Sequence, residues 1–96
     1  MEFEWDPNKA ASNLGKHGVS FEIATQVFGD DHARFEDDPY TRDEYRQTVI
    51  GMSDLGVLFV VFTERHFNVT RIISARGANP HERRKYGSVR PSAGGL

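Results

Sequence analysis

Arginine is concentrated in the last third of this 96-residue chain. Five arginines and one lysine lie between positions 65 and 85, namely Arg65, Arg71, Arg76, Arg83, Arg84 and Lys85. A guanidinium group stays positively charged at any physiological pH and binds phosphate through two parallel hydrogen bonds. When the 2′-hydroxyl of RNA attacks the adjacent phosphate, arginines directed at the phosphoryl oxygens stabilise the growing negative charge without a metal ion. This segment therefore indicates phosphoryl chemistry on RNA.

Arg76 is the strongest single candidate for a catalytic role. It ends an otherwise apolar strand-like run at Ile72-Ile73-Ser74-Ala75. A charge at such a position needs either a substrate or a partner, because an unpaired charge is costly to bury. A salt bridge to Asp37 or Glu82 is the alternative to a catalytic role. The same two interpretations apply to Arg65 and Arg83, and the remaining basic residues of the segment are more typical of a solvated helix face.

A lysine, a histidine and a tyrosine form a second group of candidates. Lys16 and His17 stand directly before Gly18. Histidine titrates near neutral pH and can act as a general acid or base. A helix C-terminus also attracts cations, so capping explains this pair equally well. Tyr86 could position or protonate a leaving group or stack on an unpaired base, but it could equally pack the last helix.

Charge is distributed unevenly along the chain. Residues 1–45 carry four basic and eleven acidic side chains, a net charge of −7, whereas residues 46–96 carry eight basic and three acidic side chains, a net charge of +5. This asymmetry favours an anionic partner for the basic half, unless the two halves neutralise each other across the fold. The total charge of −2 argues against non-specific nucleic-acid binding as the main activity. The acidic segment 30–44 is either a charged sheet edge or a surface for a basic partner.

Other classes of site find no support in the sequence. The absence of cysteine excludes disulfides and thiolate zinc sites. The four histidines share no metal-ligand spacing, and no phosphate-binding glycine loop or nucleophile elbow is present, so we expect neither a metal nor a cofactor. The longest apolar run, residues 57–62, is too short to span a bilayer, and no hydrophobic leader is recognisable. We expect a cytoplasmic protein without membrane contact.

Capping signals predict three helices, two of which contain candidate site residues described above. Asp6-Pro7 has the pattern of an N-cap followed by a first-turn proline, and Gly18 that of a C-terminal stop, so the first helix covers about residues 7–17. Its expected apolar stripe consists of Ala10, Ala11 and Leu14. By the same signals, the second helix begins at Ser20 and ends at Gly29, and the last covers about residues 80–86 and ends at Gly87.

The remaining apolar segments predict strands. A short edge strand is expected at about residues 33–36, three longer strands at 45–53, 57–65 and 69–78, and a further short one at 2–5. We predict a single α+β domain over residues 1–87, followed by a flexible tail at 88–96. Two N-terminal helices would pack on an antiparallel sheet of three to four strands, with a short C-terminal helix. A three-residue hairpin after Arg65 would place Arg65 and Arg76 on opposite sheet faces, whereas a bulge or a longer loop would bring them together.

In this order, the motifs resemble the BrnT family of toxins, part of the wider RelE-like ribonuclease group. They are Trp5-Asp6-Pro7-x-Lys9, Asn13-x-x-Lys16-His17-Gly18-Val19-Ser20-Phe21-Glu22-x-Ala24, Glu44-x-Arg46, Ile50-Gly51, Val60-Val61-Phe62-Thr63-x-Arg65, Arg71-Ile72-Ile73-Ser74-Ala75-Arg76-x-Ala78 and Glu82-Arg83-x-x-Tyr86. The resemblance extends over roughly residues 3–87.

The resemblance implies a compact RelE-like fold and a bacterial ribonuclease that needs no cofactor and stops translation when it is freed from its antitoxin. It implies a ribbon-helix-helix antitoxin whose dimer joins two toxins and carries the contact with operator DNA. Carried over to this chain, the catalytic candidates are Arg76, Arg65, His17, Lys16, Arg83 and Tyr86. The alternative is a catalytically silent module of the same fold that only scaffolds the antitoxin repressor, but the intact motif positions favour the ribonuclease.

Overall fold

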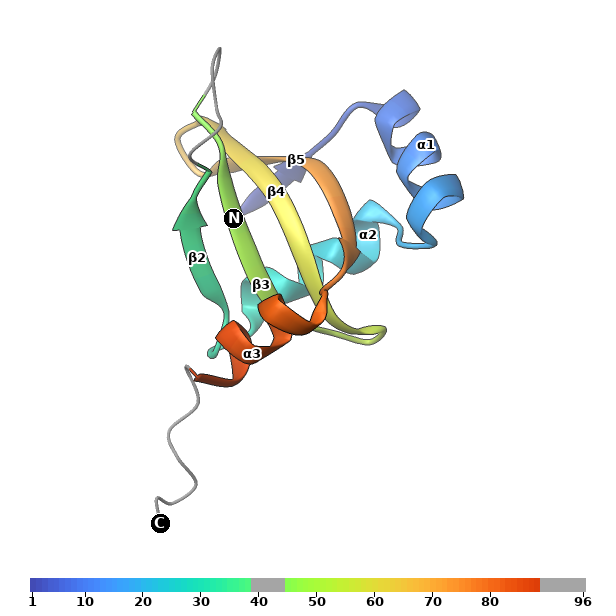
Figure 1. Cartoon of the computed structure of the whole chain (residues 1–96). Helices are drawn as coiled ribbons and strands as arrows, with labels where there is room; N and C mark the ends of the chain where they lie inside the picture. Colours follow the sequence, from blue (N-terminus) through green and yellow to red (C-terminus); the bar gives the residue numbers. More distant parts are fainter. Residues whose placement is uncertain (39–44, 89–96) are drawn as a thin grey trace.

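A five-stranded sheet with helices around it forms the part of the chain that the computed structural model describes, residues 1–38 and 45–88 (Figure 1). The strands are β1 (Glu2–Glu4), β2 (Arg34–Asp37), β3 (Gln47–Ser53), β4 (Gly56–His66) and β5 (Val69–Gly77). The helical elements are α1 (Pro7–His17), α2 (Phe21–Ala24), the 3₁₀ helix η1 (Thr25–Gly29) and α3 (Pro80–Ser88). The predicted α+β class is confirmed, whereas most of the predicted tail lies outside the described residues.

The sheet is mixed, with the strand order β1-β5-β4-β3-β2. Strands β2 to β5 form the predicted antiparallel meander, but β1 pairs in parallel with the first residues of β5. The prediction of a purely antiparallel sheet with three to four strands is therefore wrong. A meander leaves its last strand with a free edge, and the N-terminal strand occupies part of that edge, where unpaired backbone groups would otherwise remain.

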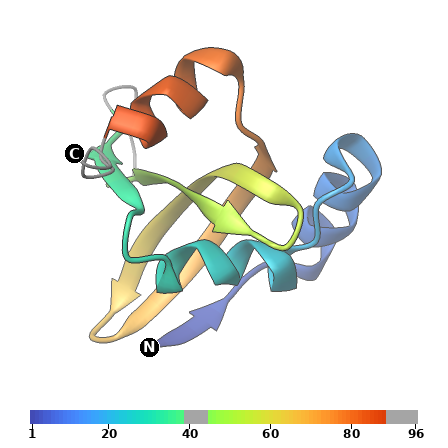
Figure 2. The ribbon, with the colours of Figure 1, turned by 90° about the horizontal axis from the view of Figure 1, so that it is seen from below.

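The helices lie at three different places around the sheet. Figure 2 shows α3 on one face, α2 and η1 on the opposite face, and α1 beside the sheet. The second predicted helix is divided into α2 and η1, and α3 continues through Gly87, which is therefore not the predicted stop. The expectation that both N-terminal helices cover a sheet face holds only for the second, because α1 contacts the edge of β5 instead.

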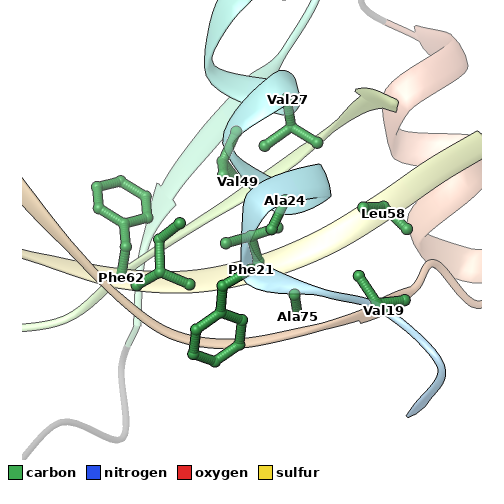
Figure 3. Packing of buried hydrophobic residues seen from close by; sticks show 10 residues of the cluster. Val19, Phe21, Ala24, Val27, Val49, Leu58, Phe62 and Ala75 are labelled. Carbon is green, nitrogen blue, oxygen red and sulfur yellow. The ribbon is translucent and has the colours of Figure 1, made fainter. Parts of the chain in front are cut away.

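The main core fills the space between the sheet and the α2–η1 segment (Figure 3). Phe21, Ala24 and Val27 from the helical side are fully buried against strand residues of β3, β4 and β5. Gly51 of β3 permits the close approach, because a Cβ atom at this position would lie 2.8 Å from Cβ of Val27. A smaller cluster on the other face joins Ile50, Ala78 and Tyr86 beneath α3. The central strand β4 is thus covered on both faces.

Helix α1 has the predicted ends but not the predicted buried face. The Asp6 side chain accepts a hydrogen bond from the Asn8 amide (2.8 Å), and Gly18 ends the helix in the left-handed conformation, with φ of 70°. Leu14, however, is 51 % exposed, and the buried residue of the helix is Asn13. The predicted apolar stripe is therefore confirmed only at Ala10, which packs against the main core, whereas Ala11 and Leu14 are exposed.

Asn13 serves as the missing neighbour of β5 at this edge. Its amide nitrogen donates to the carbonyl oxygens of Ala75 (2.7 Å) and Val19 (3.0 Å), and its amide oxygen accepts from the Ala75 amide (3.1 Å). Buried backbone groups need such partners, since leaving them unpaired costs as much as a lost hydrogen bond. The side chain thereby fixes α1 against β5, and this fixed contact creates the groove described next.

Candidate active site

A groove of about 190 Å³ lies between α1 and β5. It is lined by Lys9, Ser12, Asn13, Lys16, His17, Ile73 and Ser74. The helical members stand three or four residues apart, so that they share one face of α1. One face of α1 and the neighbouring part of β5 therefore place two ammonium groups, an imidazole and two hydroxyl groups around the same groove.

The basic side chains of this groove, Lys9, Lys16 and His17, have no ion-pair partner in the part of the chain that the structure describes. Gly18, not one of these side chains, caps the carbonyl end of α1 by donating to the Leu14 oxygen. The positive charges are therefore available to an anionic ligand, and the hydroxyl groups of Ser12 and Ser74 add hydrogen-bond donors.

Arg76 lies two residues beyond Ser74 on β5. The two residues pair with Phe59 and Val61 on β4, and residues two apart along a strand point to the same side. The guanidinium carbon of Arg76 sits 4.4 Å from the centroid of the Phe59 ring. Its two terminal nitrogens donate to the Glu82 carboxylate at 2.9 and 2.8 Å. One of the two predicted salt bridges is thus present; the Arg76 side chain remains 36 % exposed and is not among the residues that line the groove.

Glu82 holds Arg76 and begins α3 at the same time. Its carboxylate accepts from the Asn79 amide (2.9 Å), and the Asn79 side chain accepts from the Glu82 amide (2.8 Å), a reciprocal capping pair. Burial alone would raise the pKa of Glu82, but the hydrogen bonds from Arg76 and the Asn79 amide outweigh it, so the pKa lies below its ordinary value. The carboxylate is therefore ionised at neutral pH and orients the guanidinium group.

Arg65 lies at the far end of the sheet, near the β4–β5 hairpin. Its Nε atom is 3.8 Å from Oε2 of Glu4, and Nη1 of Arg71 is 3.0 Å from the same oxygen. The hairpin has a two-residue turn at Phe67-Asn68 between the paired residues His66 and Val69, and β4 and β5 contain two register shifts. These irregularities do not bring Arg65 to Arg76, because Arg71 and Arg76 are already five residues, or about 16 Å, apart along β5.

The last two candidates hold α3 in place. Arg83 donates from Nε to the carbonyl oxygen of Ala78 (3.2 Å), at the start of the helix. Tyr86 is buried, and its hydroxyl donates to Oδ2 of Asp30 (2.7 Å). Burial would raise the pKa of Asp30, but hydrogen bonds from Tyr86 and from two backbone amides lower it below its ordinary value. Of the predicted site residues, the groove thus contains Lys16 and His17, with Arg76 adjoining it along β5.

Five groove residues were not among the predicted site residues: Lys9, Ser12, Asn13, Ile73 and Ser74. The spacing of Lys9, Ser12 and Lys16 along α1 is the signal that could have identified the first two. No comparable signal exists for Ser74, because a serine inside an apolar strand does not show which element lies beside it.

The described residues offer neither a metal-binding cluster nor a membrane-spanning helix. Across residues 1–38 and 45–88, no three histidine, cysteine, aspartate or glutamate side chains gather in a way that could hold a metal ion. None of the described helices is long and apolar enough to cross a membrane.

Comparisons with known proteins agree on one family. The family model described as "Ribonuclease toxin, BrnT, of type II toxin-antitoxin system" matches residues 5–82. The crystal structure of the ribonuclease toxin BrnT from Brucella abortus is similar to this chain, with a TM-score of 0.63 and 27 % sequence identity, over 82 % of this chain and 97 % of that one. None of the curated protein sequences matches significantly.

Proposed function

The chain belongs to the BrnT family of ribonuclease toxins of type II toxin–antitoxin systems, and we propose that it cleaves RNA, without a metal ion, at the groove between α1 and β5. The observation that carries this proposal is the convergence of Lys9, Lys16 and His17 on one groove without an ion-pair partner among the described residues. An unneutralised cationic groove of this size accommodates a phosphodiester better than an uncharged ligand.

Each side chain receives a part in a transesterification. His17 takes the proton from the 2′-hydroxyl, whose oxygen then forms a bond to the adjacent phosphorus. The bond from phosphorus to the 5′-oxygen breaks, and this leaving oxygen takes a proton from water. The hydroxide formed in this way takes the first proton back from His17. The products are a 2′,3′-cyclic phosphate and a 5′-hydroxyl. Lys9 and Lys16 hold the phosphate while its charge grows.

Arg76 stabilises the negative charge that develops on the phosphoryl oxygens. Glu82 and the Phe59 ring fix the guanidinium group before substrate arrives, and a preoriented charge needs no reorganisation during the reaction. Among the other predicted catalytic residues, Arg83 and Tyr86 support this arrangement through α3. Arg65 contributes positive charge from the hairpin end of the sheet.

The proposal extends to the biological setting of a RelE-like toxin. Membership in a type II family implies a cognate antitoxin, which we propose to be a ribbon-helix-helix protein whose dimer joins two toxins and binds operator DNA. Freed from it in the cytoplasm, the toxin cleaves RNA and thereby stops translation. The second candidate function is a catalytically silent scaffold for the repressor. It does not explain why the lysines of the groove have no ion-pair partner among the described residues.

Inducible expression of the chain without antitoxin tests the proposal. Wild type and His32→Ala, a histidine change outside the groove, should arrest growth with loss of total RNA, whereas His17→Ala and Arg76→Ala should not. With purified protein, His17→Ala should reduce kcat about 100-fold or more, the usual contribution of a general base. Equal arrest by all four chains would exclude the groove as the active site. Normal growth with soluble wild-type protein would favour the silent scaffold.

A further inference from the structure

We infer that Ile73 and Ser74 of β5 form the nucleoside-binding wall of the groove, against which the nucleotide with the attacking 2′-hydroxyl lies. This inference rests on the proposed function, because it names the part of the RNA that occupies the groove beside the phosphate. It assigns the contact with sugar and base to β5 and leaves the phosphate to the basic side chains of α1.

Ile73 is an extra residue in β5. Val61 of β4 pairs with Ser74, and the next residue of β4, Phe62, pairs with Ile72. Two steps along β5 thus correspond to one step along β4, and Ile73 has no partner in the register, as in a β-bulge. A bulge redirects side chains locally, and bulges are over-represented beside active sites. In this protein the bulge lies where β5 borders the groove.

The bulge changes which side chains of β5 reach the main core. Ile72 and Ala75 both belong to this core, although they stand three residues apart in the sequence. In a regular strand, side chains on one face are separated by an even number of residues. Ile73 and Ser74 lie between these two core residues, are half-buried, and both line the groove. The bulge thus presents an isoleucine and a serine to the groove.

The groove consequently has a basic side and an uncharged side. Lys9, Lys16 and His17 belong to α1, whereas the β5 side consists of the apolar Ile73 and the hydroxyl-bearing Ser74. A nucleotide is divided in the same way, because its phosphate is anionic while its sugar and base have apolar surfaces and polar edges. Binding sites for small molecules commonly combine apolar side chains with a few oriented polar groups. The β5 side therefore fits a nucleoside, and a phosphate ion alone would leave it unused.

The proposed reaction determines which nucleoside occupies this side. His17 takes the proton from the 2′-hydroxyl, so the ribose in the groove belongs to the nucleotide on the 5′ side of the cleaved bond. Ile73 then packs against this nucleoside and removes apolar surface from water. The Ser74 hydroxyl both donates and accepts hydrogen bonds, so it can serve the polar edge of any base.

Titration with two phosphate ligands tests the inference. Inorganic phosphate probes the basic side alone, whereas cytidine 3′-monophosphate adds a base and a ribose with its 2′-hydroxyl but contains no phosphodiester bond to cleave. In isothermal titration calorimetry, the wild type should bind the nucleotide about tenfold more tightly than phosphate, because apolar surface is buried as well. Ile73→Ala should lower the nucleotide affinity to that of phosphate and leave the phosphate affinity unchanged. Lys16→Gln should weaken both ligands.

Two accompanying variants separate binding from effects on the strand. Ile73→Thr keeps the β-branched shape that suits a strand but replaces apolar surface by a hydroxyl, so the preference for the nucleotide should fall here too. Val69 is a half-buried apolar residue at the other end of β5 and is not among the residues that line the groove. Val69→Ala should therefore retain the wild-type preference.

The outcomes distinguish the inference from the function on which it rests. A wild type that cleaves RNA but shows no preference for the nucleotide, or a preference retained in both Ile73 variants, would overturn the inference alone. Equal loss of both ligands in these variants would also overturn it, because Ile73 would then only shape the groove. A wild type that binds neither ligand and cleaves no RNA would overturn the proposed function as well.

Discussion

At the scale of single residues, the arrangement of Arg76 shows why a salt bridge and a catalytic role do not exclude each other. Glu82 satisfies two guanidinium nitrogens, the Phe59 ring supports one face, and part of the side chain stays exposed beside the groove. A charge that is held in this way is oriented before the substrate binds. The two interpretations that the sequence left open for Arg76 therefore describe one device.

Replacing Glu82 by glutamine should lower both the stability of the fold and the rate of cleavage. The amide keeps the size of the side chain but loses the charge-assisted bonds to Arg76, so the free energy of unfolding should fall by about 1.5–3 kcal/mol. The kcat for RNA cleavage should fall at least tenfold with little change in KM, since Arg76 acts on the transition state. Steady-state kinetics and urea unfolding measure both effects. Glu22→Gln, an exposed change at the start of α2, is the control; an unaltered kcat in Glu82→Gln would contradict the positioning role.

Residue types indicated candidate side chains but not where those side chains lie in the fold. Lys16 and His17 were identified because a histidine beside a lysine is informative wherever it lies, and both line the groove. Tyr86 was identified for the same reason but is buried against Asp30, because its ring completes the small core under α3. Burial and direction depend on contacts between distant segments, which the spacing of residues in one segment does not contain.

At the scale of elements, the ends of α1 were predicted correctly, whereas its orientation against the sheet was not. The capping residues act locally and are visible in the sequence, so the helix begins and ends where expected. Its contacts depend on β5, whose free edge exists only because β1 pairs with no more than the first residues of that strand. The parallel pairing of β1 was missed for the same reason, since it joins residues 2–4 to residues 69–71. The meander strands, in contrast, follow one another directly and were predicted nearly to the residue.

The orientation of α1 should depend on Asn13, the buried residue of this helix. Asn13→Ala leaves the amide and the carbonyl of Ala75 without their partner, and each unsatisfied buried group costs about 1–3 kcal/mol. We expect a clear loss of thermal stability together with loss of cleavage, because the groove is built on this contact. Differential scanning fluorimetry should show no comparable loss for Asn8→Ala, an exposed position on the same helix. An unchanged Tm for Asn13→Ala would contradict the role of the side chain as an edge partner.

At the scale of the whole molecule, charge joins the two halves of the sequence. Glu4 of β1 forms an ion pair with Arg71 of the neighbouring strand β5, and Glu36 of β2 forms one with Lys85 of α3. The acidic half of the chain therefore neutralises part of the basic half. This agrees with the interpretation that the two halves compensate each other across the fold. What remains positive is the groove, because Lys9 and Lys16 line it and no carboxylate is among its lining residues.

Stability should fall in acid because three carboxylates hold α3. The Lys85 hydrogen bond lowers the pKa of Glu36, and the hydrogen-bonded Asp30 and Glu82 also have pKa values below the ordinary 3.8 of aspartate and 4.5 of glutamate. Groups with a depressed pKa stabilise the fold fully above these ordinary values and lose that effect as the pH falls through the folded-state pKa. Urea unfolding between neutral pH and about pH 3 should show this decline. Asp30→Asn should flatten it, Glu22→Gln should leave it as in the wild type, and equal slopes in all three would contradict the assignment.

The contact between Asn13 and Ala75 also has a consequence for how the protein is made. Its two partners are 62 residues apart in the chain, and a ribosome adds only about 5–20 residues per second from the N-terminus. During most of its synthesis the nascent polypeptide therefore has α1 but no strand to place beside it. Chains that are released before β5 is complete have no groove, so interrupted synthesis yields no fragments able to cut RNA. The groove forms only once β5 has been synthesised.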